Sequence, residues 1–296
     1  MKFFRKLFGG RRESKVRSNW APFKFPGDIL KPEAVGVFAS PDVSGSWSAI
    51  YMTRALQESF PNLPVHLVIR KDYAQLAEFL PWLPEIHMWG SDSSVTEPQI
   101  EPGVLMFASE PCDDLLRFVE KCTPRACVSV SAHSAVNIHV KTEGDPFPDA
   151  VRTMTGILGL KYPEDWKPEP PQVLSEKASS ILSPISHKTL PYILATEAAA
   201  SILDRKKAEI PLKIVLADGK ASSIPPETDH SLFAAVVSGA SAVVTTDRYL
   251  WVHSRALGVP VVGLDRKGVF QGWGGEPAGG ESQFLEQWAS LIRRGW

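Results

Sequence analysis

The sequence predicts an α/β protein with two parallel-sheet domains and a helix at the C-terminal end. Short apolar runs rich in β-branched residues alternate with helical stretches through most of the chain. In runs such as 242–246 and 259–264 polar and apolar residues do not alternate, as is typical of strands covered on both faces in a parallel sheet. A proline-rich stretch at 161–172 divides the chain into two parts.

Composition narrows the class of protein. The chain has 296 residues, 44% of them apolar and 22% charged, with a net charge of −1, and nothing overall points to nucleic acid. Three cysteines without metal-binding spacing favour a reducing compartment. No apolar run approaches the roughly 20 residues of a membrane span, and the start lacks the apolar core of a secretory signal. We therefore expect a cytoplasmic protein.

Residues 1–30 form a basic N-terminal segment. Residues 1–17 carry seven lysines and arginines against one glutamate. Phe3, Phe4, Leu7 and Phe8 would share one face of a short helix, a pattern typical of a segment that lies in an anionic membrane interface. The alternative is a disordered, solubilising tail.

The N-terminal domain is expected to span residues 31–160. A strand at 34–39, a polar turn, a helix at 47–60 and a strand at 65–69 form one right-handed βαβ unit. Further strands are predicted at 85–89, 103–108 and 126–131, and helices at 73–79, 112–122 and 149–160.

The C-terminal domain is expected to span residues 173–296. We predict a strand near 179–183, the turn SPISHKTLP, a helix at 192–204 and a strand at 212–217. A helix at 231–238 then leads into a strand at 242–246, a second helix, and a strand at 259–264. The helix at 281–294 places its apolar residues on one face.

Three stretches of the chain resemble the heptosyltransferases, glycosyltransferase family 9. They are RALQESFPNLPVHLVIRKDYAQLAEFLPWLPEIHMW, SPISHKTLPYILATEAAASIL and SLFAAVVSGASAVVTTDRYLWVHSRALGVPVVGL. The resemblance covers about residues 33–275. It implies the GT-B architecture, two Rossmann-like domains that face a cleft, with the acceptor bound by the N-terminal domain and the donor by the C-terminal one.

The resemblance implies a catalytic base in the turn at 40–48, where the family has a Gly-Asp pair. Here the pair reads Gly45-Ser46, and a serine hydroxyl does not accept a proton near pH 7 without help. Asp42 could substitute as the base if the turn brings it round. The alternative is that its carboxylate bonds its own backbone, as in many S-P-D-x-S-G turns.

The resemblance places the donor phosphates at the turn SPISHKTLP. Lys188 would neutralise the leaving diphosphate, supported by Ser183, Ser186 and the N–H groups of the next helix. The alternative for Lys188 is a solvated loop side chain. Asp42, Ser46 and Lys188 are thus the candidate catalytic residues.

The donor is also expected to contact the strand-to-helix turn at Asp247, through Thr246, Asp247, Arg248 and His253. The family has Asp-Ser-Gly here and a histidine five residues after the aspartate. In this chain the glycine is replaced by Tyr249, and the histidine lies one place later, which turns its side chain by about 100° on a helix. The alternative for Asp247 is a helix N-cap, and for Arg248 a solvated side chain.

No metal or cofactor is expected, because the other histidines, which include His66 and His87, share no metal-binding spacing. Asp229 and His230 belong to a polar cluster that could border the donor site, although a plain surface loop is the interpretation we favour.

Two functions follow from these features. The first is an inverting, metal-independent glycosyltransferase, which would move a sugar from a nucleotide sugar such as ADP-heptose to a lipopolysaccharide-type glycolipid or saccharide. It would work at the inner face of the membrane if residues 1–17 bind there. The second is a catalytically inactive relative that keeps the fold and binds a saccharide or a protein partner. The replaced Gly-Asp pair, the lost Asp-Ser-Gly and the displaced histidine favour the second.

Overall fold

The computed structural model describes residues 33–90, 100, 104–122, 124–140, 149–157, 162–163, 165–183, 191–217, 224, 228–270 and 275–295. The expected N-terminal segment, residues 1–30, lies outside them. The chain forms two compact units, Met1–Trp166 and Lys167–Trp296, and the division falls within the proline-rich stretch 161–172. Within the described ranges, no helix is both long and apolar enough to cross a membrane.

The first unit contains a parallel sheet, as the sequence predicts. Its strand order is β3-β2-β1-β4-β5-β6. The strands are β1 (Val35–Phe38), β2 (Val65–Arg70), β3 (Glu85–Trp89), β4 (Leu105–Ala108), β5 (Ala126–Ser129) and β6 (Ile138–His139). β1 and β4 are buried along their whole length, which explains why their sequences lack polar alternation.

Helices cover both faces of this sheet. They are α3 (Val43–Ser59), the 3-10 helix η2 (Lys71–Phe79), α4 (Asp113–Cys122) and α5 (Asp149–Ile157). The crossovers through α3 and α4 run in opposite directions across the sheet, so right-handed connections place the two helices on opposite faces. On the α4 face, Leu115 and Phe118 pack with Phe38, Val68 and Met106 in one buried cluster.

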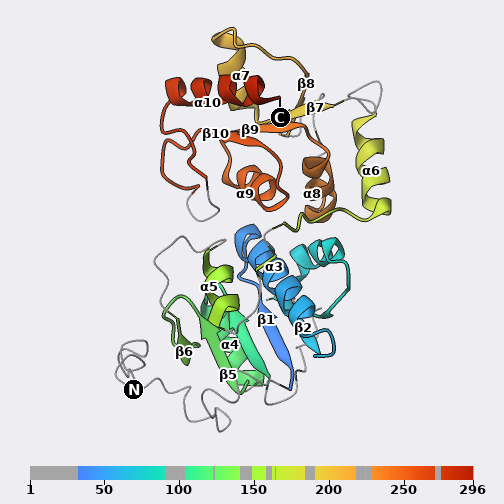
Figure 1. Cartoon of the computed structure of the whole chain (residues 1–296), viewed down its shortest axis with the longest axis vertical. Coiled ribbons are helices and arrows are strands. Elements are labelled where there is room, and N and C mark those ends of the chain that lie inside the picture. Colours follow the sequence, from blue (N-terminus) through green and yellow to red (C-terminus); the bar gives the residue numbers. More distant parts are fainter. Residues whose placement is uncertain are drawn as a thin grey trace. The chain divides into compact units, whose positions relative to one another are not determined.

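The second unit contains a four-stranded parallel sheet with the order β10-β9-β7-β8. Its strands are β7 (Tyr192–Ala195), β8 (Lys213–Leu216), β9 (Ala242–Thr245) and β10 (Val261–Gly263). Figure 1 shows α7 (Glu197–Arg205) and α10 (Glu281–Arg294) on one face, with α8 (His230–Ser238) and α9 (Arg248–Ala256) on the other. α6 (Gln172–Leu182) packs against α8.

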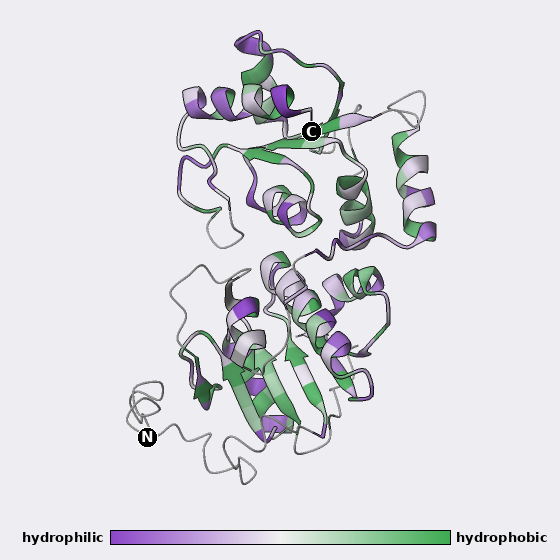
Figure 2. Ribbon diagram, in the orientation of Figure 1, coloured by the Kyte–Doolittle hydropathy of each residue, from purple (hydrophilic) through white to green (hydrophobic). Residues whose placement is uncertain are grey.

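The hydropathy of the two units follows this layering. The strands of both sheets are hydrophobic, and the polar residues lie mainly on the outward sides of the helices (Figure 2). In the second unit α7 and α10 pack onto the sheet through Leu203, Phe284 and Trp288, which are almost fully buried together with Ile193 and Val244. Because helices cover both faces of the sheet, the ends of the strands are the part of the sheet that a ligand can approach.

Two elements of the second unit differ from the sequence prediction. The strand expected near 179–183 is wrong, because these residues belong to α6 and its C-terminal end, with Leu174 and Ala178 buried at helical spacing. The helix expected at 192–204 begins only at Glu197, because the fully buried Tyr192–Ala195 forms β7. The stretch SPISHKTLP is therefore followed in the chain by a strand, and not by the helix that the sequence predicts; the turn that follows the strand is at Thr196.

Candidate functional site

A cavity of about 540 Å³ lies in the second unit, beside the carboxyl ends of β7 and β9. From β7 the chain passes to β8 on one side of the sheet, while β9 pairs with β7 on the other, so the strand order reverses between β7 and β9. In open parallel sheets, ligands bind in the crevice outside the carboxyl ends of the strands at such a reversal. The topology therefore marks this cavity as the candidate site of the unit.

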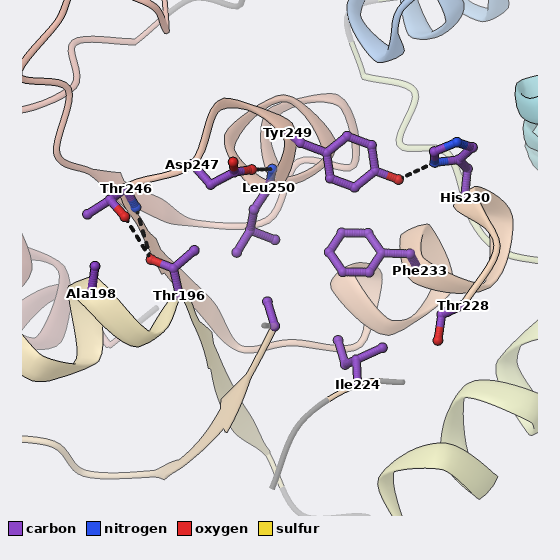
Figure 3. A pocket seen from close by; sticks show the side chains of 11 residues that line it. Thr196, Ala198, Ile224, Thr228, His230, Phe233, Thr246, Asp247, Tyr249 and Leu250 are labelled. Carbon is purple, nitrogen blue, oxygen red and sulfur yellow. Dashed lines mark hydrogen bonds between the residues drawn. The ribbon is translucent and has the colours of Figure 1, made fainter. Parts of the chain in front are cut away.

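Two threonines join the strand ends at the base of the cavity. Thr196 follows β7 and Thr246 follows β9, and the amide of Thr246 donates to Thr196 Oγ1 at 3.1 Å. The two hydroxyl oxygens are 3.2 Å apart (Figure 3). One residue earlier, Thr245 Oγ1 accepts a bond from the amide of Asp247 at 2.8 Å. These bonds fix the backbone of both strand-to-helix turns.

Three helices begin at the cavity. α7 starts directly after Thr196, and Asp247 caps α9 through a bond from the Leu250 amide to Oδ1 at 3.0 Å. Asp229 caps α8 in the same way, with the Leu232 amide 2.8 Å from Oδ1. Free N–H groups and the helix dipole make such ends favourable for anions, although the capping carboxylates already use part of this potential.

An aromatic wall closes one side of the cavity. It consists of His230, Phe233 and Tyr249, and Figure 3 shows the tyrosine hydroxyl directed at His230 Nδ1, to which it is hydrogen-bonded. The rings of Phe233 and Tyr249 are tilted with their centroids 5.2 Å apart. Tyr249 stands where the resembled family has glycine, so its side chain occupies space that a glycine would leave to a ligand.

His253 lies behind this wall. It is fully buried, and its ring packs edge-on against Tyr249 at 4.5 Å between centroids and against Phe233 at 5.4 Å. Burial, and then the charge of His230, lower the pKa of His253 to about 3, so its imidazole is neutral near pH 7.

The charge of the cavity is low. Among the lining residues that the structure describes, Asp247 is the one carboxylate, and there is no lysine or arginine. Apart from the two threonines already named, Asp247 and the aromatic wall, the lining consists of Ala198, Ala217, Ile224, Thr228 and Leu250. A bound diphosphate would thus depend on the helix N-termini and on cations from outside the described lining.

The predicted donor residues fall into different places. Thr246 and Asp247 line the cavity, and Arg248 opens α9 next to them without being part of the described lining. Ser183 caps the C-terminal end of α6, is exposed, and likewise does not belong to that lining. Ser186 and Lys188 lie outside the described residues, so their roles stay predictions.

The predicted catalytic turn lies in the first unit, at the carboxyl end of β1. Asp42 caps α3, with the Gly45 amide 2.7 Å from its Oδ1. Ser46 is fully buried within α3 and donates its hydroxyl to the carbonyl of Asp42 at 2.8 Å. A Cβ on Gly45 would lie 2.4 Å from Ser40 Cβ, so this turn needs glycine for close approach. Asp42 as the catalytic base remains a prediction, and the geometry gives its carboxylate a capping bond.

Sequence reasoning missed the roles of Thr196 and Phe233, and assigned His230 to a plain loop. Thr196 directly follows the buried run YILA and so occupies the strand-to-helix position that Asp247 occupies after β9. Correct placement of β7 would have identified it. Phe233 carries no such signal, because an apolar residue in a helix equally predicts a core position.

We expect buried His253 to make the second unit acid-sensitive. The pKa of histidine is about 6.5 in the unfolded chain, and that of His253 is about 3 in the folded unit. Below pH 6.5 the imidazole is therefore protonated in the unfolded chain but stays neutral in the folded unit. The free energy of unfolding should fall by at most about 1.4 kcal/mol per pH unit between these values. Denaturant unfolding at pH 7 and pH 5 measures this.

The variant His253→Leu should show a shallower fall of stability with pH, while His139→Gln, at an exposed histidine of β6, should keep the wild-type slope. An unchanged slope in His253→Leu would contradict the assignment.

No protein-family model and no curated protein matches the chain. Three solved structures are similar to it over almost their whole length. ADP-heptose LPS heptosyltransferase II of E. coli is 12% identical, with 88% of this chain and 99% of that chain covered at a TM-score of 0.59. E. coli heptosyltransferase WaaC with ADP is 13% identical, with 89% and 100% covered at a TM-score of 0.59. The family 9 glycosyltransferase of Veillonella parvula is 10% identical, with 89% and 98% covered at a TM-score of 0.58.

Because the sequence identities are 10–13%, the similarity to these structures concerns the fold. The sequence prediction of a heptosyltransferase-like chain is confirmed for the fold. With its two parallel-sheet units, the chain has the GT-B-like fold of the family 9 glycosyltransferases.

Proposed function

We propose that the protein is a glycosyltransferase whose nucleotide-sugar donor binds in the cavity beside β7 and β9. The observation that carries this proposal is the convergence of three helix N-termini on a cavity with an aromatic wall. N-termini stabilise a diphosphate, and an aromatic wall suits a planar base or the apolar face of a sugar. Support also comes from similar structures, since WaaC was solved with ADP and with ADP-2-deoxy-2-fluoro heptose.

The proposed reaction is an inverting transfer to a saccharide or to a glycolipid of the lipopolysaccharide type. Asp42 would deprotonate the acceptor hydroxyl, and Lys188 would neutralise the leaving diphosphate. Ser46, which donates its hydroxyl to the Asp42 carbonyl, would support Asp42 in this role. Asp42 is suited to this role in one respect, because the bond from the Gly45 amide holds its carboxylate in place.

A second candidate function is binding without catalysis. Tyr249 is the specific observation in favour of this function. The tyrosine ring, which is hydrogen-bonded to His230, fills the turn at which the resembled family has glycine. The described cavity lining also lacks a lysine or arginine, so a diphosphate would be held weakly. In this case the unit would bind a saccharide or a partner and release it unchanged.

Calorimetry with ADP, ADP-sugars and UDP-sugars tests donor binding. We expect binding of at least one of these nucleotides. Lys188 comes before β7 in the chain, whereas the cavity lies beside the carboxyl end of that strand, so Lys188→Ala tests the predicted lysine contact separately. Loss of a charged hydrogen bond to phosphate would weaken binding about tenfold or more. Tyr249→Phe, which keeps the ring of the aromatic wall, should bind like the wild type. Lys177→Ala, at an exposed lysine of α6, is the matched control. If no nucleotide binds, the donor-site proposal fails.

Turnover separates the two candidate functions. Asp42→Asn retains an equally good helix cap, so the fold should be kept while the proposed base is lost. We expect sugar transfer, measured as release of nucleoside diphosphate with a saccharide acceptor, to fall about 100-fold or more. Full activity in Asp42→Asn would refute the base assignment alone, whereas nucleotide binding without any turnover in the wild type would favour the binding protein.

Membrane contact through residues 1–17 is part of the same proposal, because a glycolipid acceptor lies at a membrane surface. The seven basic residues of this segment should each contribute about 1 kcal/mol near anionic lipid. We expect the full chain to co-sediment with vesicles that contain phosphatidylglycerol at low salt and to be released at high salt. The chain without residues 1–17 should stay in the supernatant, and its co-sedimentation would contradict this role.

A further inference from the structure

Two histidines and a glutamate meet at one edge of the sheet in the first unit, on the neighbouring strands β2 and β3. In the parallel pairing of β2 with β3, His66 lies beside Glu85 and Val68 lies beside His87. Neighbours in register share a sheet face, and residues two apart on one strand share it too. His66, Glu85 and His87 therefore project from the same face, the one on which Val68 and Trp89 pack against α4.

The ligand atoms of these three side chains are in mutual contact. His66 Nδ1 lies 3.0 Å from His87 Nε2 and 3.3 Å from one Glu85 carboxylate oxygen, and the other Glu85 oxygen lies 3.4 Å from His87 Nε2. Ligands about 2.0–2.1 Å from a tetrahedral zinc ion are separated from one another by about 3.3 Å. The separations from His66 Nδ1 to His87 Nε2 and to one Glu85 oxygen are thus within a few tenths of an ångström of two edges of a zinc tetrahedron, and one ligand atom of each residue lies within 4.8 Å of the other two.

The burial of the three residues suits a metal site. The side chains of His66 and His87 are 12% and 9% exposed, so packing restricts their rotamers, whereas that of Glu85 is 63% exposed. β3 is the edge strand of the sheet that the structure describes, and no further described strand covers this side of the cluster. An ion could therefore enter past Glu85 and meet two imidazoles already held in place.

We propose that His66, Glu85 and His87 form a binding site for a zinc ion. Two imidazole nitrogens and one carboxylate are a donor set that zinc prefers, and water would complete the tetrahedron. The ion would join the edge strand β3 to β2 through side chains, in addition to their backbone bonds. The site lies in the first unit and is independent of the donor cavity.

The same three side chains could form a cluster held by hydrogen bonds alone. A measurement of metal binding distinguishes this cluster from a zinc site. The full chain, stripped with a chelator and dialysed, is titrated with zinc chloride in a calorimeter. We expect uptake of a single ion per chain, and a melting temperature that rises with zinc concentration because the ion binds the folded chain. Cobalt in place of zinc should give the intense visible absorption of a tetrahedral site.

Variants locate the ion. Glu85→Gln removes a ligand at an exposed position, so the fold should be kept, and it should weaken zinc binding at least about tenfold. His87→Gln should do the same, with circular dichroism as the check on folding. His139→Gln, at the opposite edge of the same sheet, is the control and should bind like the wild type. Lack of zinc uptake by the wild type, or undiminished uptake by both Glu85→Gln and His87→Gln, would overturn the proposal.

Discussion

The parallel pairing of β7 with β9 is the constraint on which the candidate site depends. Parallel strands bring their carboxyl ends to one edge of the sheet, and each of these two strands continues directly into a helix. The amino ends of α7 and α9 therefore meet, and the bond from the Thr246 amide to Thr196 Oγ1 fixes their spacing. The cavity exists because this pairing leaves a crevice where the order of the strands reverses.

The residues around that crevice show a balance between stability and binding. Asp247 and Asp229 use their carboxylates to cap helices, which stabilises the unit but reduces the pull of the helix ends on an anion. Tyr249 and Phe233 add apolar contact and cover the buried ring of His253. The fold is GT-B-like, while the side chains in this turn favour a packed pocket whose described lining holds one carboxylate.

Prediction from the sequence succeeded where one residue pattern has one physical solution. Buried runs such as AVVT at 242–245 give strands wherever they lie, and the apolar face of 281–294 gives a helix that must pack. It failed at 179–183, where SSILS is equally compatible with a strand, and at 192–195, where helical residues follow YILA without a break. At 192–195 burial in the sheet decides the element, whereas at 179–183 the helix continues from Leu174 and Ala178, which are buried at helical spacing.

The sequence by itself determined the two parallel-sheet units, the Asp247 turn and the resemblance to a glycosyltransferase family, because these depend on local periodicity and on short contiguous motifs. Only the tertiary structure decided that Thr196 meets Thr246 and that His66 meets His87, since these pairs are 50 and 21 residues apart. Strand order and register bring such residues together. Register follows from the packing of the whole sheet, which no single stretch of sequence specifies.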